Sequence, residues 1–158
     1  MAPLLVLIIV TILARVGGQL GVHTLKDWSL ATRVGLAVMF CFTAAAHFNS
    51  MCGDLIRMVP ASVPYPELMV TFTGVCEILG AVGLLVPRTR RVSALALILF
   101  LIAVLPANIY AAQAELTLRG SPVTPLIPRV ALQALFILLV GWSGIYSGRQ
   151  PIAAKEIA

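Results

Sequence analysis

Five long apolar runs, separated by short polar links, dominate the pattern of the chain. They occupy residues 3–21, 30–48, 67–86, 92–113 and 128–147. Each run has about the twenty residues that a helix rising about 1.5 Å per residue needs to cross a hydrocarbon core of about 30 Å. The pattern predicts an all-α fold, in which residues 1–158 form one polytopic helical bundle in a membrane.

The third and fourth runs form a hairpin with a short basic link. Residues 87–91 of this link carry three positive charges and no negative charge. Halfway along the third run lies Glu77, at a depth where lipid tails would be the solvent. Placing a charge there costs at least about 2.5–3.5 kcal/mol on insertion scales, and such residues usually serve a function. Glu77 is therefore the first candidate for chemistry.

The composition supports the membrane interpretation. The chain is 60% hydrophobic and 11% charged, whereas soluble domains are about 45–50% apolar. A net charge of +5 suggests nucleic acid in a soluble protein, but here the basic residues lie at the ends of apolar runs. They are better explained as topology and headgroup signals. We therefore expect membrane lipid, and no nucleic acid, as a partner.

The basic residues also predict an orientation. Five crossings place eight Lys and Arg residues on one side and three on the other. The first set is Arg15, Lys26, Arg33, Arg88, Arg90, Arg91, Arg149 and Lys155, and the second is Arg57, Arg119 and Arg129. The positive-inside rule then predicts a multi-pass protein of the cell (inner) membrane, with the N-terminus outside and the C-terminus cytoplasmic. The longer loops, residues 49–66 and 114–127, would face outward.

Two features of the sequence leave alternatives open. A secretory signal peptide competes with a retained helix for residues 3–21, but the segment before this run lacks Lys and Arg, so a retained helix is favoured. The prolines at 60, 64 and 66 exclude a regular helix through the second half of loop 49–66, and apolar residues in its first half predict that it folds back on the bundle.

The three cysteines predict no metal site. Cys41, Cys52 and Cys76 form neither a CxxC motif nor a metal-ligand spacing, and an odd number cannot all pair within the chain. Cys52, in the outer loop, is the best candidate for a reactive thiol, and its oxidation state stays open.

Polar side chains gather in the outer half of the predicted bundle. At helical spacing Glu77 shares a face with small residues, which is typical of a contact between helices. Glu77 and His47 are the candidates for catalysis. The candidates for ligand binding are Thr73, Asn108, Tyr110, Arg129 and Gln133. Pro106 leaves the Ile102 carbonyl without its helical donor. We expect a polar pocket that opens outward, with Glu77 at its floor.

Each of these residues also has a structural explanation. Glu77 could form an ion pair with Arg129, or bond Gln133 as a protonated acid. His47 and Tyr110 could be interfacial, and Asn108 could serve only in hydrogen bonds between helices.

Several short motifs resemble the DoxX family of small bacterial membrane proteins. They are Ala46-His47-Phe48, Met58-Val59-Pro60, Val63-Pro64, residues 73–80 (TGVCEILG), residues 83–90 (GLLVPRTR), residues 105–110 (LPANIY), and Arg129 with Gln133. The resemblance covers about residues 30–142. It implies a four-helix core with residues 3–21 as an additional N-terminal transmembrane helix. It also implies a quinone or thiol redox partnership, although the chain lacks the paired cysteines of the thiol branch.

Three functions follow as hypotheses. The first is an oxidoreductase-associated subunit that holds a lipophilic small molecule, with a quinone as the candidate cofactor, and that works with a redox partner protein. The second is a self-contained enzyme, of the isomerase or hydrolase type, that uses acid and base chemistry on an apolar substrate. The third is a structural or assembly partner in the membrane. The sequence leaves the ligand, the partner protein and the oligomeric state open.

Overall fold

The computed structural model of the protein describes residues 2–118, 120–122 and 124–147, and the chain is all-α apart from one very short hairpin. Five helices in this part of the chain are long and apolar enough to cross a membrane. They are α1 (Ala2–Gln19), α2 (Trp28–Ala44), α4 (Pro66–Leu85), α5 (Arg90–Gln113) and α6 (Leu126–Gly141). The 3₁₀ turn η2 (Ala45–Phe48) extends α2, and the π-helical turn η3 (Trp142–Tyr146) extends α6.

Four smaller elements complete the described structure. The 3₁₀ turn η1 (His23–Lys26) joins α1 to α2, and the short helix α3 (Cys52–Met58) lies between η2 and α4. Strands β1 (Thr117–Leu118) and β2 (Ser121–Pro122) pair antiparallel between α5 and α6. The sequence pattern predicted neither α3 nor the β1–β2 hairpin.

Capping side chains and prolines explain where some of the helices begin and end. The Asp27 carboxylate accepts hydrogen bonds from the backbone N–H groups of Ser29 (3.2 Å) and Leu30 (3.1 Å), so α2 begins two residues before the predicted run. Pro66 stands at the first turn of α4, where its missing N–H is not needed. The α3 helix ends at Met58, before Pro60, as the prolines of this loop predicted.

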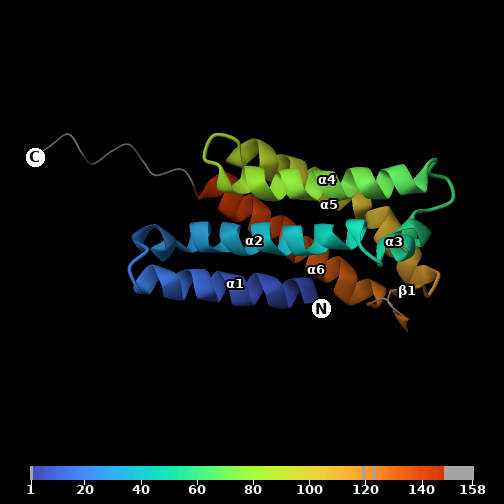
Figure 1. Cartoon of the computed structure of the whole chain (residues 1–158), viewed down its shortest axis with the longest axis horizontal. Coiled ribbons are helices and arrows are strands. Elements are labelled where there is room, and N and C mark those ends of the chain that lie inside the picture. Colours follow the sequence, from blue (N-terminus) through green and yellow to red (C-terminus); the bar gives the residue numbers. More distant parts are fainter. Residues whose placement is uncertain (1, 119, 123, 148–158) are drawn as a thin grey trace, which may run out of the picture.

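Helices α2, α4, α5 and α6 pack as a ring, and α1 packs outside this ring. Along the chain, α2 packs on α4, α4 on α5 and α5 on α6, while α6 and η3 return to α2. Helix α1 packs along α2 (Figure 1). The largest apolar side chains fully buried in the core are Leu36, Met39, Phe40, Leu84, Leu97 and Val140.

The two ends of the bundle differ in charge. We call the end that holds η1, the link between α4 and α5, and η3 the basic end; it lies on the left in Figure 1. The loop end, with η2, α3 and the β1–β2 hairpin, lies on the right. The described basic side chains of the basic end are Arg15, Lys26, Arg33, Arg88, Arg90 and Arg91. Arg119, Arg149 and Lys155, which entered the orientation count, lie outside the described residues.

Large apolar side chains cover the outside of the bundle. Leu13 of α1 is 62% exposed, Leu79 of α4 66% and Leu99 of α5 67%. Water-soluble monomers rarely expose apolar surface so continuously, because it would aggregate. This exposed surface supports a membrane protein, as the five apolar runs predicted. The loop of residues 49–66 also folds back on the bundle as predicted, since α3 contacts α4, α5 and η2.

Candidate functional site

Glu77 is buried between α2 and α4. The residue is only 6% exposed. Its Oε1 atom accepts a hydrogen bond of 2.8 Å from the Thr43 hydroxyl of α2. Its Oε2 atom is buried, accepts no hydrogen bond from a described residue, and lies 3.4 Å from His47 Nε2, within ion-pair distance. The acid thus faces the interior of the bundle, as its small neighbours predicted.

His47 reaches Glu77 from the η2 turn. Its Nδ1 atom lies 2.7 Å from the Val70 carbonyl oxygen of α4 and 3.4 Å from the Thr73 hydroxyl. A carbonyl oxygen can only accept a hydrogen bond, so Nδ1 carries the proton and donates it to Val70. The lone pair of a neutral His47 would then lie on Nε2 and point at Glu77.

This geometry sets the number of protons that the two side chains share. An ionised Glu77 and a neutral His47 would turn two acceptors toward each other in a water-poor interior. One additional proton removes the conflict, either as a carboxylic acid that faces Nε2 or as an imidazolium that faces a carboxylate. Glu77 and His47 therefore form a buried pair that can share one proton between Oε2 and Nε2. We call these two residues the proton pair.

A glycine allows the proton pair to form. A Cβ atom on Gly74 would lie 2.7 Å from His47 Cβ and 2.9 Å from His47 Cγ, closer than such atoms pack. The α4 backbone and the imidazole therefore meet only because position 74 has no side chain. The small face that the sequence predicted around Glu77 is thus the surface on which His47 rests.

Three other predicted site residues, Asn108, Arg129 and Gln133, lie between α5 and α6. The Arg129 guanidinium donates a 2.6 Å hydrogen bond from Nη1 to Asn108 Oδ1, and its Nε donates to the Thr124 carbonyl at 3.4 Å. Among the described residues no carboxylate lies within ion-pair distance of Arg129, so the expected alternative of a Glu77–Arg129 ion pair is wrong.

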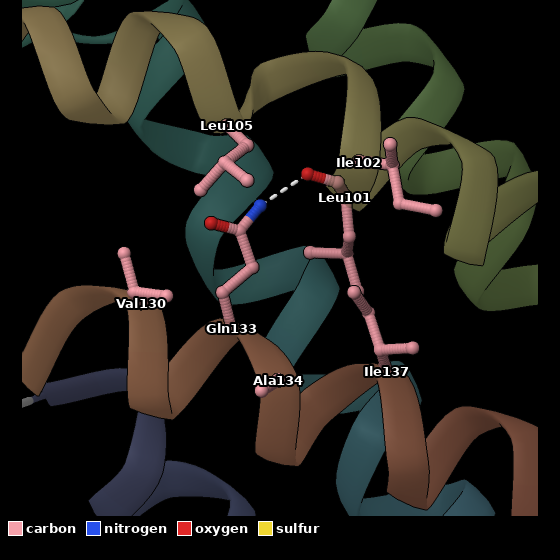
Figure 2. A pocket seen from close by; sticks show the side chains of 7 residues that line it. All are labelled: Leu101, Ile102, Leu105, Val130, Gln133, Ala134 and Ile137. Atoms are coloured by element: carbon pink, nitrogen blue, oxygen red, sulfur yellow. Dashed lines mark hydrogen bonds between the residues drawn. The ribbon is translucent and has the colours of Figure 1, made fainter.

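Gln133 of α6 is buried at the same interface. Its amide nitrogen donates to the Leu101 carbonyl of α5, as Figure 2 shows. The Ile102 carbonyl, which the sequence predicted to lack its helical donor because of Pro106, belongs to the next residue of α5, and Ile102 is 53% exposed. The Gln133 Oε1 atom is buried without a hydrogen-bond partner in the described chain. Glu77 forms no bond with Gln133, so that expected alternative is also wrong.

A small groove lies against Gln133. Its volume is about 100 Å³, and its wall is apolar apart from the Gln133 amide. The lining residues, drawn in Figure 2, are Leu101, Ile102, Leu105, Val130, Gln133, Ala134 and Ile137. Ile102 and Val130 are exposed on the outside of the bundle. The groove therefore opens sideways between α5 and α6, whereas the sequence predicted a pocket that opens at the end of the bundle.

Glu77 and Gln133 lie at a similar depth. Gly80 of α4 packs on Leu97 of α5, because a Cβ at position 80 would lie 2.5 Å from Leu97 Cδ2. The two helices are antiparallel, so three to four residues toward the loop end bring Glu77 level with Leu101. Gln133 bonds the Leu101 carbonyl. Glu77 and Gln133 thus share a depth in the bundle, but they lie at two separate interfaces.

The structure sorts the predicted site residues into groups. It brings Glu77, His47 and Thr73 together on the α2–α4 side, and Asn108, Arg129 and Gln133 on the α5–α6 side. The Tyr110 hydroxyl forms no hydrogen bond with a described residue, and the side chain is exposed. Sequence reasoning missed Thr43, although its position four residues before His47 places both on one helix face.

Within the described residues, no group of three or more His, Cys, Asp or Glu side chains has a metal-binding arrangement. Cys41, Cys52 and Cys76 are free thiols. The polar chemistry of the two interfaces therefore comes from the carboxyl, imidazole, amide, hydroxyl and guanidinium groups.

One protein-family model matches most of the chain. The family described as "Domain of unknown function (DUF8561)" has a model that matches residues 36–144. The chain belongs to the DUF8561 family. The match begins inside α2 and ends in η3, so it covers most of the ring of helices and leaves out α1. No curated protein and no solved structure shows a significant match to the chain.

The resemblance to the DoxX family is therefore wrong. The quoted motifs are short, and most of them meet general needs of an apolar helical hairpin. Small residues allow helices to approach, and a proline with arginines ends a helix at a membrane boundary. Such patterns arise in unrelated families. The quinone and thiol redox functions that rested on the resemblance lose that support.

Proposed function

We propose that this DUF8561 protein is a multi-pass membrane protein that binds the polar end of a lipophilic small molecule in the α5–α6 groove and exchanges one proton with the water at the loop end through the proton pair. The ligand would be an apolar molecule that carries a hydroxyl or carbonyl group. The observation that carries the proposal is the buried Glu77 with His47 Nε2 at 3.4 Å from its Oε2. A buried acid beside a base is the usual equipment for proton exchange in a water-poor site.

The path of the proton follows from the exposure of the two side chains. The Glu77 side chain is 8% exposed and the His47 side chain 14%. Imidazole has two nitrogens, so it can pass a proton between the carboxyl group and the water at the loop end. In the proposal Glu77 is the inner acid, and His47 is the group that reloads it.

The class of ligand follows from the α5–α6 groove. Its lateral opening and apolar wall favour a molecule that arrives from the lipid phase. The unpaired Gln133 Oε1 requires a hydrogen-bond donor, and a ligand hydroxyl would supply one. A cavity of about 100 Å³ is smaller than the roughly 300–1,000 Å³ of pockets that enclose a drug-sized molecule. The groove would therefore hold the polar end of the ligand, with its apolar part in the bilayer.

Purification from native membranes tests the proposal. Apolar molecules extracted from the purified protein are identified by mass spectrometry, for the wild type and for Gln133→Leu. We expect a hydroxyl- or carbonyl-bearing lipophile that is retained by the wild type and depleted in Gln133→Leu. An extract that contains only bulk phospholipid, equal in both proteins, would contradict ligand binding.

The proton step needs a separate measurement. Infrared spectroscopy reports a protonated carboxyl group, and transfer of the wild type from H₂O to D₂O should shift this band as the proton exchanges. The change should be absent in Glu77→Gln and present in Glu67→Gln. Glu67 is the matched control because it is a carboxylate of the same helix, exposed in its first turn. A band change that persists in Glu77→Gln would exclude Glu77 as the exchanging acid.

The orientation in the membrane is part of the proposal. The basic end would face the cytoplasm and the loop end the outside, because Lys and Arg concentrate on the cytoplasmic side. Single-cysteine proteins test this with a membrane-impermeant maleimide on intact cells. The native Cys52 thiol of the loop end should react, and a cysteine at the exposed position 88 should react only after lysis. The opposite labelling would reverse the orientation.

A self-contained enzyme is the second candidate. The observation that favours it is the 2.7 Å contact from His47 Nδ1 to the Val70 carbonyl, which fixes the tautomer and the ring orientation that a general base needs. Turnover of the extracted lipophile by the purified protein, lost in Glu77→Gln and kept in Glu67→Gln, would favour the enzyme over a binding protein.

A further inference from the structure

A second unusual charge lies at the basic end, away from the proton pair. Arg33 of α2 is only 8% exposed, yet no carboxylate of a described residue lies within ion-pair distance of it. Its Nε donates to the Ser29 carbonyl at 3.4 Å. A guanidinium offers five N–H donors, and Nε is the Arg33 nitrogen that has an acceptor among the described residues. The terminal Nη donors of Arg33 are therefore open to an acceptor group from outside the described chain.

Arg90 also has an N–H group without a hydrogen-bond acceptor among the described residues. It is the first residue of α5, and its Nε atom is buried without a hydrogen-bond partner in the described chain. Arg90 repels Arg33 electrostatically, and the attractive charge that acts on Arg33 is Asp27. Both carboxylate oxygens of Asp27 already accept the N-terminal N–H groups of α2. The two cations thus lie near enough to repel each other, and no carboxylate of a described residue lies within ion-pair distance of either.

A tightly packed frame fixes this arrangement. The Ser29 hydroxyl donates to the Ser143 carbonyl of η3 at 3.2 Å and also contacts the Ser147 hydroxyl. Gly144 packs so closely on Ala94 of α5 that an added Cβ would lie 2.5 Å from the Ala94 Cβ. These contacts join α2, η3 and α5. Arg33 and Arg90 lie one helical turn from Ser29 and Ala94, respectively, so the frame holds their backbones in place.

We propose that Arg33 and Arg90 together bind a phosphate group at the basic end. Arginine pairs with phosphate through two parallel N–H···O bonds, which would use donors of both side chains and remove their repulsion. In a membrane the basic end lies at headgroup depth, so the phosphate of an anionic phospholipid is one source and inorganic phosphate is the other. The lipid source depends on the membrane placement proposed above. It does not depend on the proton pair.

The test uses the full chain, purified in detergent and stripped of lipid. Thermal unfolding is followed while phosphatidylglycerol, phosphatidylcholine or inorganic phosphate is titrated. We expect phosphatidylglycerol to raise the melting temperature, with an apparent affinity about fivefold weaker in Arg90→Gln, because one basic residue contributes about 1 kcal/mol to binding an anionic lipid. Arg91→Gln is the matched control, since Arg91 is exposed on the next position of the same turn. Its affinity should equal that of the wild type.

Each titrant and each variant distinguishes one explanation of the stabilisation from the others. Protection by inorganic phosphate as strong as by phosphatidylglycerol would assign the site to free phosphate. Equal protection by phosphatidylcholine, or an equal loss in Arg91→Gln and Arg90→Gln, would overturn the proposal, since neither result requires a built site.

Arg33→Gln should weaken binding at least as much as Arg90→Gln, but Arg90, which is only half-buried, remains decisive if Arg33→Gln fails to fold. Glu77→Gln should keep the full effect, so a failure of the proposed function would not be mistaken for a failure of this site.

Discussion

The α2–α4 and α5–α6 interfaces handle buried polar groups in different ways. At the α2–α4 interface an acid meets a base, and a single proton can make the pair neutral or leave it as an ion pair. At the α5–α6 interface the Arg129 cation meets the neutral Asn108 amide, at 2.6 Å. Proton exchange therefore changes the charge distribution of the first interface, whereas the second keeps its charge at any ordinary pH.

The α2–α4 and α5–α6 interfaces also differ in how closely their side chains pack. The α2–α4 interface is close, because Gly74 lets the His47 ring rest on the helix backbone. The α5–α6 interface leaves the groove of about 100 Å³ beside Gln133. Arg129, near the start of α6, can extend toward water and headgroups, as long basic side chains do. In the proposed function, proton exchange belongs to the first interface and access from the lipid phase to the second.

Removing the Glu77 side chain should have the largest effect on stability. Glu77→Ala leaves a cavity and removes the partner of His47 Nε2 and of the Thr43 hydroxyl, for a loss of about 2–5 kcal/mol in the free energy of unfolding. Glu77→Gln should lose less than about 1.5 kcal/mol, because its amide can accept from Thr43 and donate to Nε2. Equilibrium unfolding in mild detergent measures both. Equal losses in the two variants would show that the charge, and not the hydrogen bonds, holds the interface.

Filling the space beside His47 should have the next largest effect. Gly74→Ala places a Cβ 2.7 Å from His47 Cβ, and such overpacking costs about 1–3 kcal/mol. Gly53→Ala in α3 is the matched control, because an added Cβ there meets no atom within 4 Å. Both substitutions gain helix propensity, so the difference between their melting temperatures isolates the contact with His47. A Gly74→Ala protein as stable as Gly53→Ala would mean that α2 and α4 are less closely packed.

Double-mutant cycles should show that the two interfaces are independent. We expect a coupling energy of at least about 1 kcal/mol between Glu77→Ala and His47→Ala, whose side chains are in contact, and less than about 0.5 kcal/mol between Glu77→Ala and Arg129→Ala. Asn108→Ala and Arg129→Ala should couple at about 0.6 kcal/mol, the average for hydrogen bonds between membrane helices. A strong coupling between Glu77 and Arg129 would restore the single chamber that the sequence suggested.

The sequence was sufficient to predict the helices and the depth of the polar residues. Helix length and hydropathy are local properties, so the five apolar runs identify α1, α2, α4, α5 and α6 within a few residues. Depth follows from the position along a run, which is why Glu77 could be placed halfway along its helix and Gln133 with the polar residues in one half of the bundle. The small residues beside Glu77 also indicated correctly that it faces another helix.

The sequence could not show which helix faces meet. Five helices can be arranged around one another in several ways, and a polar residue at the right depth fits more than one neighbour. Arg129 was therefore grouped with Glu77, although Asn108 is its partner. Thr43 was overlooked because threonine is common in apolar helices, where its hydroxyl bonds the preceding turn. In the structure that hydroxyl also reaches Glu77. The DoxX resemblance failed for a similar reason, since short motifs report helix packing rather than ancestry.

Replacing Gln133 should have the smallest effect on stability. Gln133→Leu removes the donor to the Leu101 carbonyl, but it also removes the unpaired Oε1 atom and adds apolar contact in the groove. The two contributions oppose each other, so we expect a change within about 0.5 kcal/mol in the free energy of unfolding. Gln133→Glu, of nearly the same shape, should be much worse, because it places a carboxyl group against the Leu101 carbonyl. A large loss in Gln133→Leu would mean that Oε1 has a tightly bound partner in the membrane, which would make the α5–α6 interface as polar as the α2–α4 interface.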